Sequence, residues 1–116
     1  MISGIQHVAI EVADLGEAIA FYAKLGLEEV PRPQSLDDLP GAWLQVGAHQ
    51  VHLMVNEELE RPRTLGHVAF QVGDLDGVRH ILAERGVETT EPFDNGDGRQ
   101  CFANDPSGNL LELNEG

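Results

Sequence analysis

The sequence predicts an α+β fold made of two copies of a βαβββ unit. Residues 7–29 align with residues 67–89 without a gap at an offset of 60, and nine of the 23 positions are identical. Unrelated segments of this length share far fewer residues, so we interpret the chain as an internal duplication. Each copy also changes at the same point from the alternation of a strand to the spacing of a helix.

The first strand and the helix of each copy are predicted from local patterns. Residues 5–12 alternate apolar and polar side chains, which is typical of a half-buried strand. Asp14 and Glu17 then have the spacing of a capping box, and Gly26 is placed to end the helix. Asp74 is the predicted N-cap in the second copy. The predicted apolar faces of the two helices comprise Leu15, Ala18, Ile19, Tyr22, Leu25, Leu75, Val78, Ile81 and Leu82.

Three shorter strands complete each unit, separated by turn signals rich in Gly and Pro. They are predicted near 28–32, 41–46, 50–55, 87–91, 98–104 and 109–114. The whole chain, 1–116, is predicted to be one domain made of units 1–58 and 59–116, with the boundary in the polar stretch 56–64. The longer loop 31–41 is expected to lie over a site.

The composition narrows the class of partner. Twenty acidic residues against seven basic ones give a net charge of −13. Nucleic acid and anionic membranes would be repelled, so we expect neither as a partner and instead expect a small-molecule substrate. The N-terminus lacks the pattern of a signal peptide, and Cys101 is the single cysteine. We therefore predict a cytoplasmic protein without a disulfide, in which Cys101 is a small core residue.

Glu112 interrupts a predicted buried strand, where an unpaired carboxylate costs several kcal/mol. The offset of 60 relates Glu112 to His52, which interrupts the last strand of the first copy, and relates His7 to His67 in the two first strands. Taken singly, each histidine is more typical of a hydrogen-bonded strand residue. Together, the four equivalent positions favour a site near a pseudo-twofold axis that binds one divalent metal ion.

The motifs HVAIEVADL, HVAFQVGDL and DPSGNLLEL, together with the paired units, resemble the vicinal oxygen chelate superfamily. That superfamily includes glyoxalase I, methylmalonyl-CoA epimerase, extradiol dioxygenases, fosfomycin-resistance thiol transferases and bleomycin-binding proteins. The resemblance covers essentially the whole chain. It implies a curved eight-stranded mixed sheet whose concave face holds one divalent metal ion, without distinguishing Zn, Ni, Fe, Mn and Co. The ligand positions of the family match His7, His52, His67 and Glu112.

This sequence departs from the better-known members at one ligand. The position of His52 is usually glutamate in the glyoxalases and glutamine in the epimerases. Fosfomycin-resistance proteins use three ligands, like His7, His67 and Glu112 here, but only Arg99 matches the basic residues with which they bind phosphonate. These departures leave the specific reaction open.

Three functions are compatible with the resemblance. The first is a metal-dependent isomerase, epimerase or lyase that binds two neighbouring oxygens of a small oxygenated metabolite, with Glu112 as the catalytic base and Glu11 as the weaker candidate. The second is an extradiol-type Fe(II) dioxygenase. The third is a drug-sequestering protein without catalysis, with Trp43, Phe93 and Phe102 in its groove. In each case we expect a homodimer, either with both units of a site in one chain or with units exchanged between chains.

Overall fold

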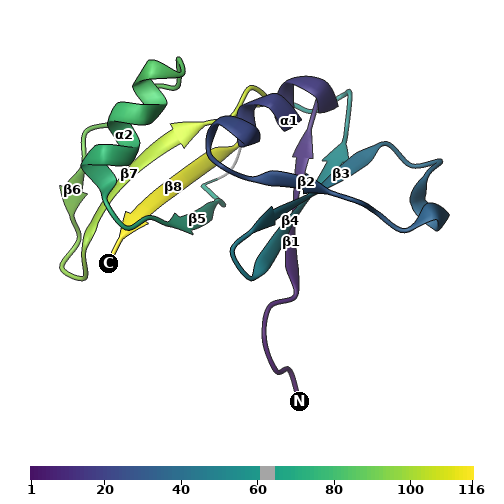
Figure 1. The fold of residues 1–116 in the computed structure, drawn as a ribbon, viewed down its shortest axis with the longest axis horizontal. Helices are drawn as coiled ribbons and strands as arrows, with labels where there is room; N and C mark the ends of the chain where they lie inside the picture. Colours follow the sequence, from purple (N-terminus) through teal and green to yellow (C-terminus); the bar gives the residue numbers. More distant parts are fainter. Residues whose placement is uncertain (61–64) are drawn as a thin grey trace. The chain divides into compact units, whose positions relative to one another are not determined.

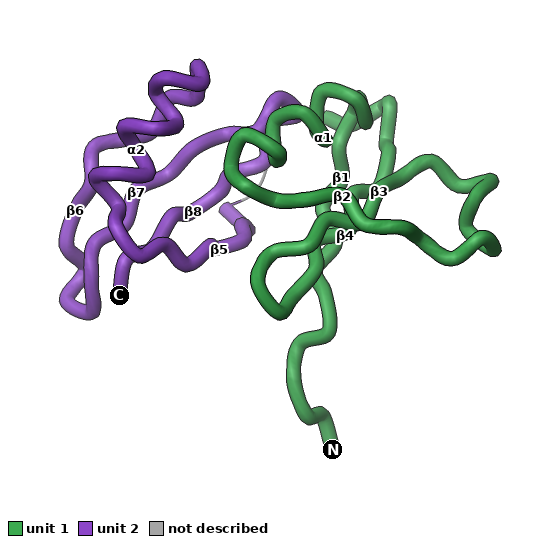
Figure 2. Tube along the Cα trace, in the orientation of Figure 1, with its two compact units in different colours: residues 1–60 green, residues 61–116 purple. Residues whose placement is uncertain are grey.

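The chain forms two compact units, Met1–Glu60 and Arg61–Gly116, coloured green and purple in Figure 2. The structure, a computed structural model, describes residues 1–60 and 65–116, so part of the predicted boundary at 56–64 lies outside the described residues. Each unit contains one α-helix and four strands (Figure 1), which confirms the predicted α+β class. The assignment of 1–116 to a single domain with units 1–58 and 59–116 stays a prediction.

The first unit is a four-stranded mixed sheet with one long helix. Its elements are β1 (His7–Val12), α1 (Leu15–Lys24), β2 (Glu28–Val30), the short 3₁₀ helix η1 (Gln34–Leu36), β3 (Gly41–Val46) and β4 (His49–Val55). The strand order is β1-β4-β3-β2, with β1 parallel to β4 and the other pairs antiparallel. Strand β2 ends earlier than predicted because Pro31 and Pro33 have no N–H to donate to a neighbouring strand.

The second unit repeats this topology. Its elements are β5 (Val68–Gln71), α2 (Leu75–Glu84), β6 (Phe93–Asp94), β7 (Arg99–Asn104) and β8 (Leu110–Glu115). The order β5-β8-β7-β6, with β5 parallel to β8, matches the order in the first unit. Hydrogen bonds thus join the eight strands as two sheets of four, one in each unit. No helix in the described part of the chain is long and apolar enough to cross a membrane.

The strand predicted at 87–91 is wrong. The segment does approach β7, since the N–H of Thr90 donates to the carbonyl of Phe102 at 2.9 Å. The hydroxyl of Thr90, however, accepts the N–H of Phe102 at 2.9 Å and so takes the place of a backbone carbonyl. Pro92 has no N–H, and regular pairing with β7 begins only at Phe93.

The helix termini follow the local signals. The carboxylate of Asp14 accepts the N–H of Glu17 at 2.9 Å, and Asp74 caps α2 in the same way. Gly26 and Gly86 adopt φ angles of 94° and 81°, in the left-handed region that glycine enters without steric cost. These caps place both helices at equivalent positions in the two units.

The core of each unit packs its helix against its sheet. The largest fully buried side chains are Val12, Tyr22, Leu44, Val51, Leu53, Leu75, Leu82, Cys101, Leu111 and Leu113. The predicted core position of Cys101 is therefore confirmed. Burial also raises the pKa of the Cys101 thiol, which disfavours the reactive thiolate.

The predicted apolar faces of the helices differ from the structure at two positions. Ile81 is 45% exposed, so its predicted inward orientation is wrong. Successive residues of a helix point about 100° apart, and the neighbouring Leu82 takes the core position. In α1, Phe21 is buried although it was not predicted to be, with its ring centroid 5.3 Å from that of Tyr22.

Candidate metal centre

The four predicted ligands lie at equivalent positions of the two sheets. In the first unit, His52 of β4 lies opposite Ala9 of β1. In the second unit, Glu112 of β8 lies opposite Ala69 of β5. His7 of β1 and His67, which directly precedes β5, each stand two residues before that alanine, and each contacts the candidate ligand of the last strand of its unit. The register of the strands therefore agrees with the sequence offset of 60.

In the first unit the two predicted ligands are in contact. The rings of His7 and His52 stack with centroids 3.9 Å apart and an interplanar angle of 16°. Trp43 of β3 stacks on the other side of His52, at 4.2 Å and 4°. Burial, followed by the neighbouring His7, lowers the pKa of His52, so its neutral form is favoured at neutral pH. A neutral imidazole is the form that binds a metal.

A chain of amide groups orients the ring of His52. The side-chain nitrogen of Gln45 donates to the carbonyl of Gly47 at 2.8 Å, and that of Gln50 donates to Oε1 of Gln45 at 3.2 Å. The oxygen of Gln50 is then left to accept from Nε2 of His52, at 2.8 Å. This arrangement assigns the proton of the neutral ring to Nε2 and leaves a lone pair on Nδ1. A metal ion that binds Nε2 would have to displace Gln50, whereas a metal ion that binds Nδ1 would not.

The second unit also brings its two predicted ligands together. Nε2 of His67 lies 3.1 Å from Oε1 of Glu112, and Nδ1 of His67 donates to the carbonyl of Leu65 at 2.8 Å. The side-chain amide of Asn114 donates to Oε2 of Glu112 at 2.8 Å. The side chain of Glu112 is 12% exposed. The carboxylate that interrupts the last strand therefore faces an imidazole and an amide.

The hydrogen bonds of His67 determine its proton affinity. The carbonyl of Leu65, and then the hydrogen bond and charge of Glu112, raise the pKa of His67 against the opposing effect of burial. Because Nδ1 donates its proton to a backbone carbonyl, Nε2 is the nitrogen that could bind a metal ion, after it loses its own proton. This is the tautomer that metal-binding histidines commonly adopt.

Aromatic rings border both pairs of candidate ligands. Phe102 of β7 lies opposite Glu112, as Trp43 of β3 lies opposite His52. Its ring meets His67 edge to face at 5.7 Å, and Phe93 lies beyond it at 6.4 Å. Of the three predicted groove residues, Trp43 and Phe102 thus contact candidate ligands, while Phe93 contacts Phe102.

A pocket of about 520 Å³ adjoins the histidine pair of the first unit. The loop that carries η1 contributes several of its walls, as the length of segment 31–41 predicts. The lining residues are Gln6, His7, Ala9, Arg32, Leu36, Leu39, Pro40, Trp43, His52, Leu53, Met54 and Val55. The pocket is thus mainly apolar, with a few polar groups at defined positions, as expected for a small-molecule site.

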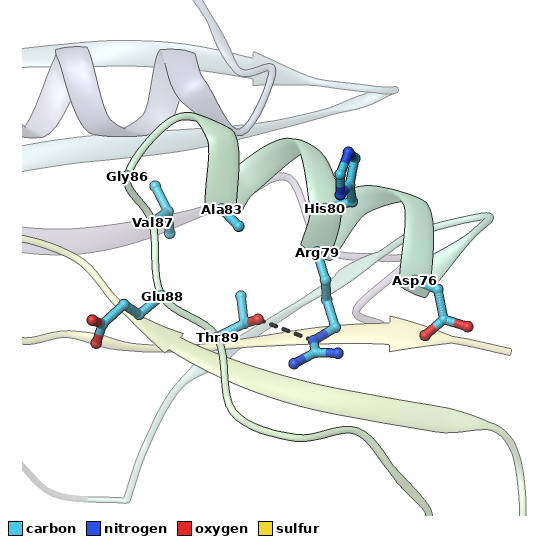
Figure 3. Close-up of a pocket in the computed structure, with 8 residues that line it drawn as sticks. All are labelled: Asp76, Arg79, His80, Ala83, Gly86, Val87, Glu88 and Thr89. Atoms are coloured by element: carbon cyan, nitrogen blue, oxygen red, sulfur yellow. Dashed lines mark hydrogen bonds between the residues drawn. The ribbon is translucent and has the colours of Figure 1, made fainter.

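A larger pocket of about 720 Å³ lies in the second unit, between α2 and the segment that follows it (Figure 3). Its lining includes Arg79, which donates through Nε to the hydroxyl of Thr89 at 3.0 Å. None of the four candidate ligands lines it. It is a polar surface depression beside a helix, and we do not assign the chemistry to it.

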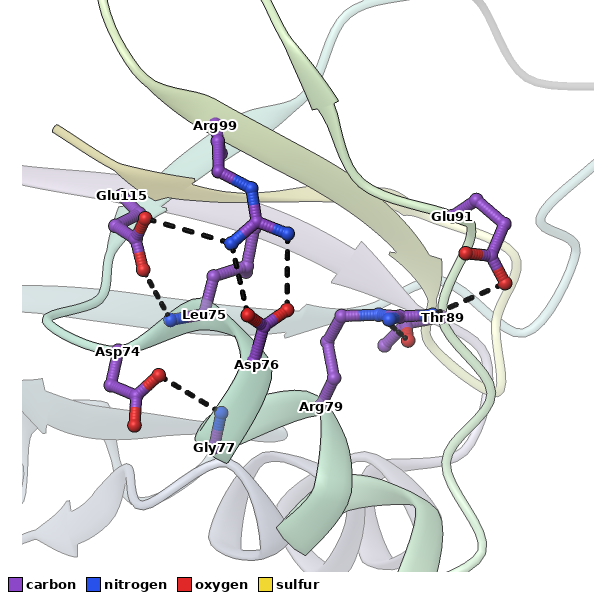
Figure 4. A network of polar contacts seen from close by, with 9 residues as sticks. All are labelled: Asp74, Leu75, Asp76, Gly77, Arg79, Thr89, Glu91, Arg99 and Glu115. Carbon is purple, nitrogen blue, oxygen red and sulfur yellow. Dashed lines mark hydrogen bonds and ion pairs between the residues drawn. The ribbon is translucent and has the colours of Figure 1, made fainter.

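Arg99 does not provide a free cation. Its guanidinium binds both carboxylate oxygens of Asp76, at 3.0 and 3.1 Å, and lies 3.9 Å from Glu115 (Figure 4). The hydrogen bond and charge of Arg99 hold the pKa of Asp76 below its usual range. The one residue that matched the basic residues of fosfomycin-resistance proteins therefore stabilises the start of α2.

Each unit thus supplies one pair of the predicted ligands. Within residues 1–60 and 65–116, no three His, Cys, Asp or Glu side chains are already gathered as a metal site. The donor types do fit a divalent ion, because imidazole nitrogens and a carboxylate oxygen are its common ligands. That the two pairs share one ion stays a prediction. The alternative base Glu11 is exposed and accepts a hydrogen bond from Asn56 at 2.8 Å.

Sequence reasoning missed the residues that support these ligands. Gln50 stands two residues before His52 and Asn114 two residues after Glu112, so both share a face with the ligand they contact. That spacing was a usable signal. Arg32, at the end of the strand predicted near 28–32, carried no comparable signal, and the structure places it in the loop after β2.

Comparisons with known proteins agree with the fold and the motifs. The sequence model of the Glyoxalase/Bleomycin resistance protein/Dioxygenase superfamily matches residues 4–113. Glyoxylase I 4 of Arabidopsis thaliana is 28% identical over 123 residues, which cover 97% of this chain and 70% of that protein. A putative glyoxalase family protein from Bacillus anthracis has a TM-score of 0.89 and 31% identity, with 99% and 96% of the two chains covered. A mutant of the fosfomycin resistance protein FosX from Listeria monocytogenes, solved with Mn(II) and 1S,2S-dihydroxypropylphosphonic acid, has a TM-score of 0.83 and 26% identity, with 100% and 94% covered.

Proposed function

Since the chain belongs to the Glyoxalase/Bleomycin resistance protein/Dioxygenase superfamily, we propose that it is a divalent-metal-dependent enzyme acting on a small oxygenated metabolite. Two neighbouring oxygens of the substrate would bind at the metal site, and the reaction would be an isomerisation, an epimerisation or a lyase reaction. The observation that supports this most is the contact within each equivalent pair, His7 with His52 and His67 with Glu112.

The proposed metal ligands are His7, His52, His67 and Glu112. When bound, a divalent ion supplies Lewis-acid polarisation of a substrate oxygen and stabilises negative charge that develops there. The chain's part is to hold the ligands in their binding forms. The Leu65 carbonyl accepts from Nδ1 of His67, which would leave Nε2 for the ion, and the lowered pKa of His52 keeps that ring neutral.

Glu112 is the proposed catalytic base. It is the one carboxylate among the four residues, and only its Oε1 faces His67, while Oε2 accepts from Asn114. The hydrogen bond from the amide of Asn114 limits the rotation of the Glu112 side chain. Glu112 would take a proton from the carbon adjacent to the polarised carbonyl group, and the proton would return to a neighbouring atom in an isomerisation or to the same carbon in an epimerisation.

The metal remains one of Zn, Ni, Fe, Mn and Co. Mn(II) in the complex of the FosX mutant supports a divalent ion. The proposed assembly is a homodimer with exchanged units, in which His7 and His52 come from one chain and His67 and Glu112 from its partner.

Metal binding by the purified protein tests the proposal. Protein prepared without chelators is analysed for metal content, then stripped and titrated with Zn(II) and Mn(II) by calorimetry. We expect about one ion per subunit, with tight binding abolished in the His67→Ala, Glu112→Ala double variant. His80→Ala is the matched control, because His80 is an exposed histidine on α2 whose contact is Glu84.

Two results would decide against the proposal. Stoichiometric metal in the double variant would exclude these residues as ligands. Oxygen consumption with catechols, but no turnover in a screen of α-keto, thiohemiacetal and acyl-CoA substrates, would favour the dioxygenase instead.

A further inference from the structure

Arg32 lies in the wall of the pocket that contains His7 and His52. It is half-buried, and its Nη2 donates to two backbone carbonyls of its own loop, that of Leu36 at 3.0 Å and that of Leu39 at 2.6 Å. These two bonds hold the guanidinium at a defined place beside the pocket. They also leave the N–H groups of Nε and Nη1 for another acceptor.

The charge of Arg32 is not neutralised by the described residues. No carboxylate of residues 1–60 or 65–116 forms an ion pair with it, although the chain carries twenty acidic residues. Arg79 and Arg99, by contrast, pair with Glu91 and Asp76 (Figure 4). A half-buried guanidinium with no carboxylate partner among the described residues is available to an anion from solution.

The backbone beside Arg32 leaves room for the guanidinium. A Cβ at Gly41 would lie 3.0 Å from Nη1 of Arg32 and 2.6 Å from the carbonyl oxygen of Leu53. The absence of a side chain at Gly41 therefore lets the guanidinium lie close to the start of β3. The position of the guanidinium is therefore defined by the backbone at Gly41 as well as by the carbonyls of Leu36 and Leu39.

The rest of the pocket is suited to a small ligand with a short apolar part. Leu36, Leu39, Pro40 and Trp43 supply apolar walls, while the imidazoles of the pocket belong to the proposed metal ligands. Arg32 is thus a cationic group, distinct from the metal ligands, in a pocket of a strongly acidic protein. A planar guanidinium in such a place recognises oxyanions.

We propose that Arg32 binds an anionic group of the substrate, a carboxylate or a phosphonate, and so determines specificity for charged over neutral metabolites. The proposal rests on the proposed function for the substrate's oxygen donors, but the charge preference of the pocket is measurable without turnover. Arg32 would orient the anionic end while the vicinal oxygens reach the ligand pair.

The test compares probes that differ in charge. Lactate, its neutral amide lactamide, and 1-hydroxyethylphosphonate are titrated into the metal-free and the Zn(II)-loaded protein. Emission of Trp43, which lines the pocket and is the single tryptophan of the chain, reports binding. We expect an anionic probe to bind at least about tenfold more tightly than lactamide, which corresponds to roughly 1.4 kcal/mol. Whether lactate or the phosphonate gains more identifies the oxyanion.

Three variants separate charge recognition from support of the loop. Arg32→Gln should remove the preference for the anionic probe, and Arg32→Lys should retain part of it. Arg79→Gln, which changes the net charge equally in the other unit, should leave the ratio of affinities unchanged. A structural role alone would instead weaken charged and neutral probes by the same factor in Arg32→Gln.

The outcomes also separate this proposal from the proposed function. The role of Arg32 would be overturned if the wild type showed no preference for the anionic probe. It would also be overturned if Arg32→Gln left the ratio of the two affinities unchanged, or weakened the binding of both probes by the same factor. Zn(II) affinity measured without any probe should be the same in wild type and Arg32→Gln. If Zn(II) does not bind while the charge preference depends on Arg32, the metalloenzyme fails and the anion site stands.

Discussion

At the scale of single residues, His52 and Glu112 occupy equivalent strand positions but have different neighbours. His52 lies between two rings, and an amide oxygen accepts from its Nε2. Glu112 faces His67 and accepts from the amide of Asn114. The two positions therefore present a neutral imidazole and a carboxylate, two kinds of donor that one divalent ion accepts together.

Replacing His52 with Ala should weaken metal binding less than replacing His67 with Ala. Nε2 of His52 is already hydrogen-bonded to Gln50, which lies outside the proposed ligand set. Nε2 of His67, in contrast, faces the proposed ligand Glu112. Calorimetric titration with Zn(II) measures both affinities, and a larger loss in His52→Ala would contradict the prediction. The emission of Trp43 should also change in His52→Ala, because its stacking partner is gone.

Asp105 is a residue on which stability depends. Its carboxylate, in a residue only 4% exposed, accepts the backbone N–H groups of Ser107 and Asn109 and the side-chain amide of Asn109, each at 2.9 Å. Asp105→Ala should lower the free energy of unfolding by about 2–4 kcal/mol, because these donors lose their acceptor. Urea unfolding measures this, with the exposed Asp38→Ala as control. A loss below about 1 kcal/mol would mean that water replaces the carboxylate.

At the scale of elements, polar contacts connect the start of α2 to two strands. Arg99 at the start of β7 binds Asp76 in the first turn of α2, and Glu115 at the end of β8 accepts the N–H of Leu75 at 2.7 Å (Figure 4). A carboxylate at a helix N-terminus also interacts favourably with the helix dipole. These contacts fix α2 on the sheet whose last strand carries Glu112.

The pair of Asp76 and Arg99 should make stability depend on pH in the acid range. The hydrogen bond and charge of Arg99 lower the pKa of Asp76. The pair therefore stabilises the fold fully above the unfolded-state pKa of Asp76, about 3.9, and this contribution is lost as pH falls through the lower folded-state value. Melting temperatures of wild type and Asp76→Asn should differ at pH 7 and begin to converge as pH falls below about 4.

The control for this comparison is Asp38→Asn, which changes the same charge at an exposed position. The melting temperature of Asp38→Asn should differ little from that of the wild type between pH 7 and pH 3. Since Asp76 and Arg99 are exposed, added salt should also reduce the difference between wild type and Asp76→Asn at pH 7. A difference that persists unchanged below pH 3 would assign the effect to something other than the charge of Asp76.

At the scale of the whole molecule, each unit carries one pair of the proposed ligands, and the proposed four-ligand site for one ion would need both pairs. Strands β1 and β2 are the edges of one sheet, and β5 and β6 those of the other. Edge strands readily serve as contact surfaces between chains. Exchange of units between two subunits would thus complete two sites in a symmetric dimer.

Mixing two inactive variants tests the exchanged dimer. His7→Ala and His67→Ala proteins are each expected to lose tight metal binding. In hybrid dimers of the exchanged form, one site contains neither substitution and the other contains both, so metal binding should partly return after subunit exchange. Native mass spectrometry verifies that hybrids form. Hybrids without recovered binding would place each site within a single chain.

The sequence by itself determined the duplication, the helix caps, most strands and the four candidate ligands. These features follow from local periodicity and from an offset of 60, which the strand register reproduces at His52 and Glu112. The prediction of a strand at 87–91 from the sequence failed, because the hydroxyl of Thr90 accepts the N–H of Phe102, a residue of β7. Alternation along one chain does not report such a contact.

Only the tertiary structure decided which groups these residues meet. The contact of His67 with Glu112 spans 45 positions and depends on how β5 pairs with β8. Arg32 and Arg99 look alike in the sequence, yet Arg99 is neutralised by Asp76 while Arg32 is held by two carbonyls of its own loop. The reason is physical: the charge available at a site depends on its neighbours in space, which strand pairing and loop path determine.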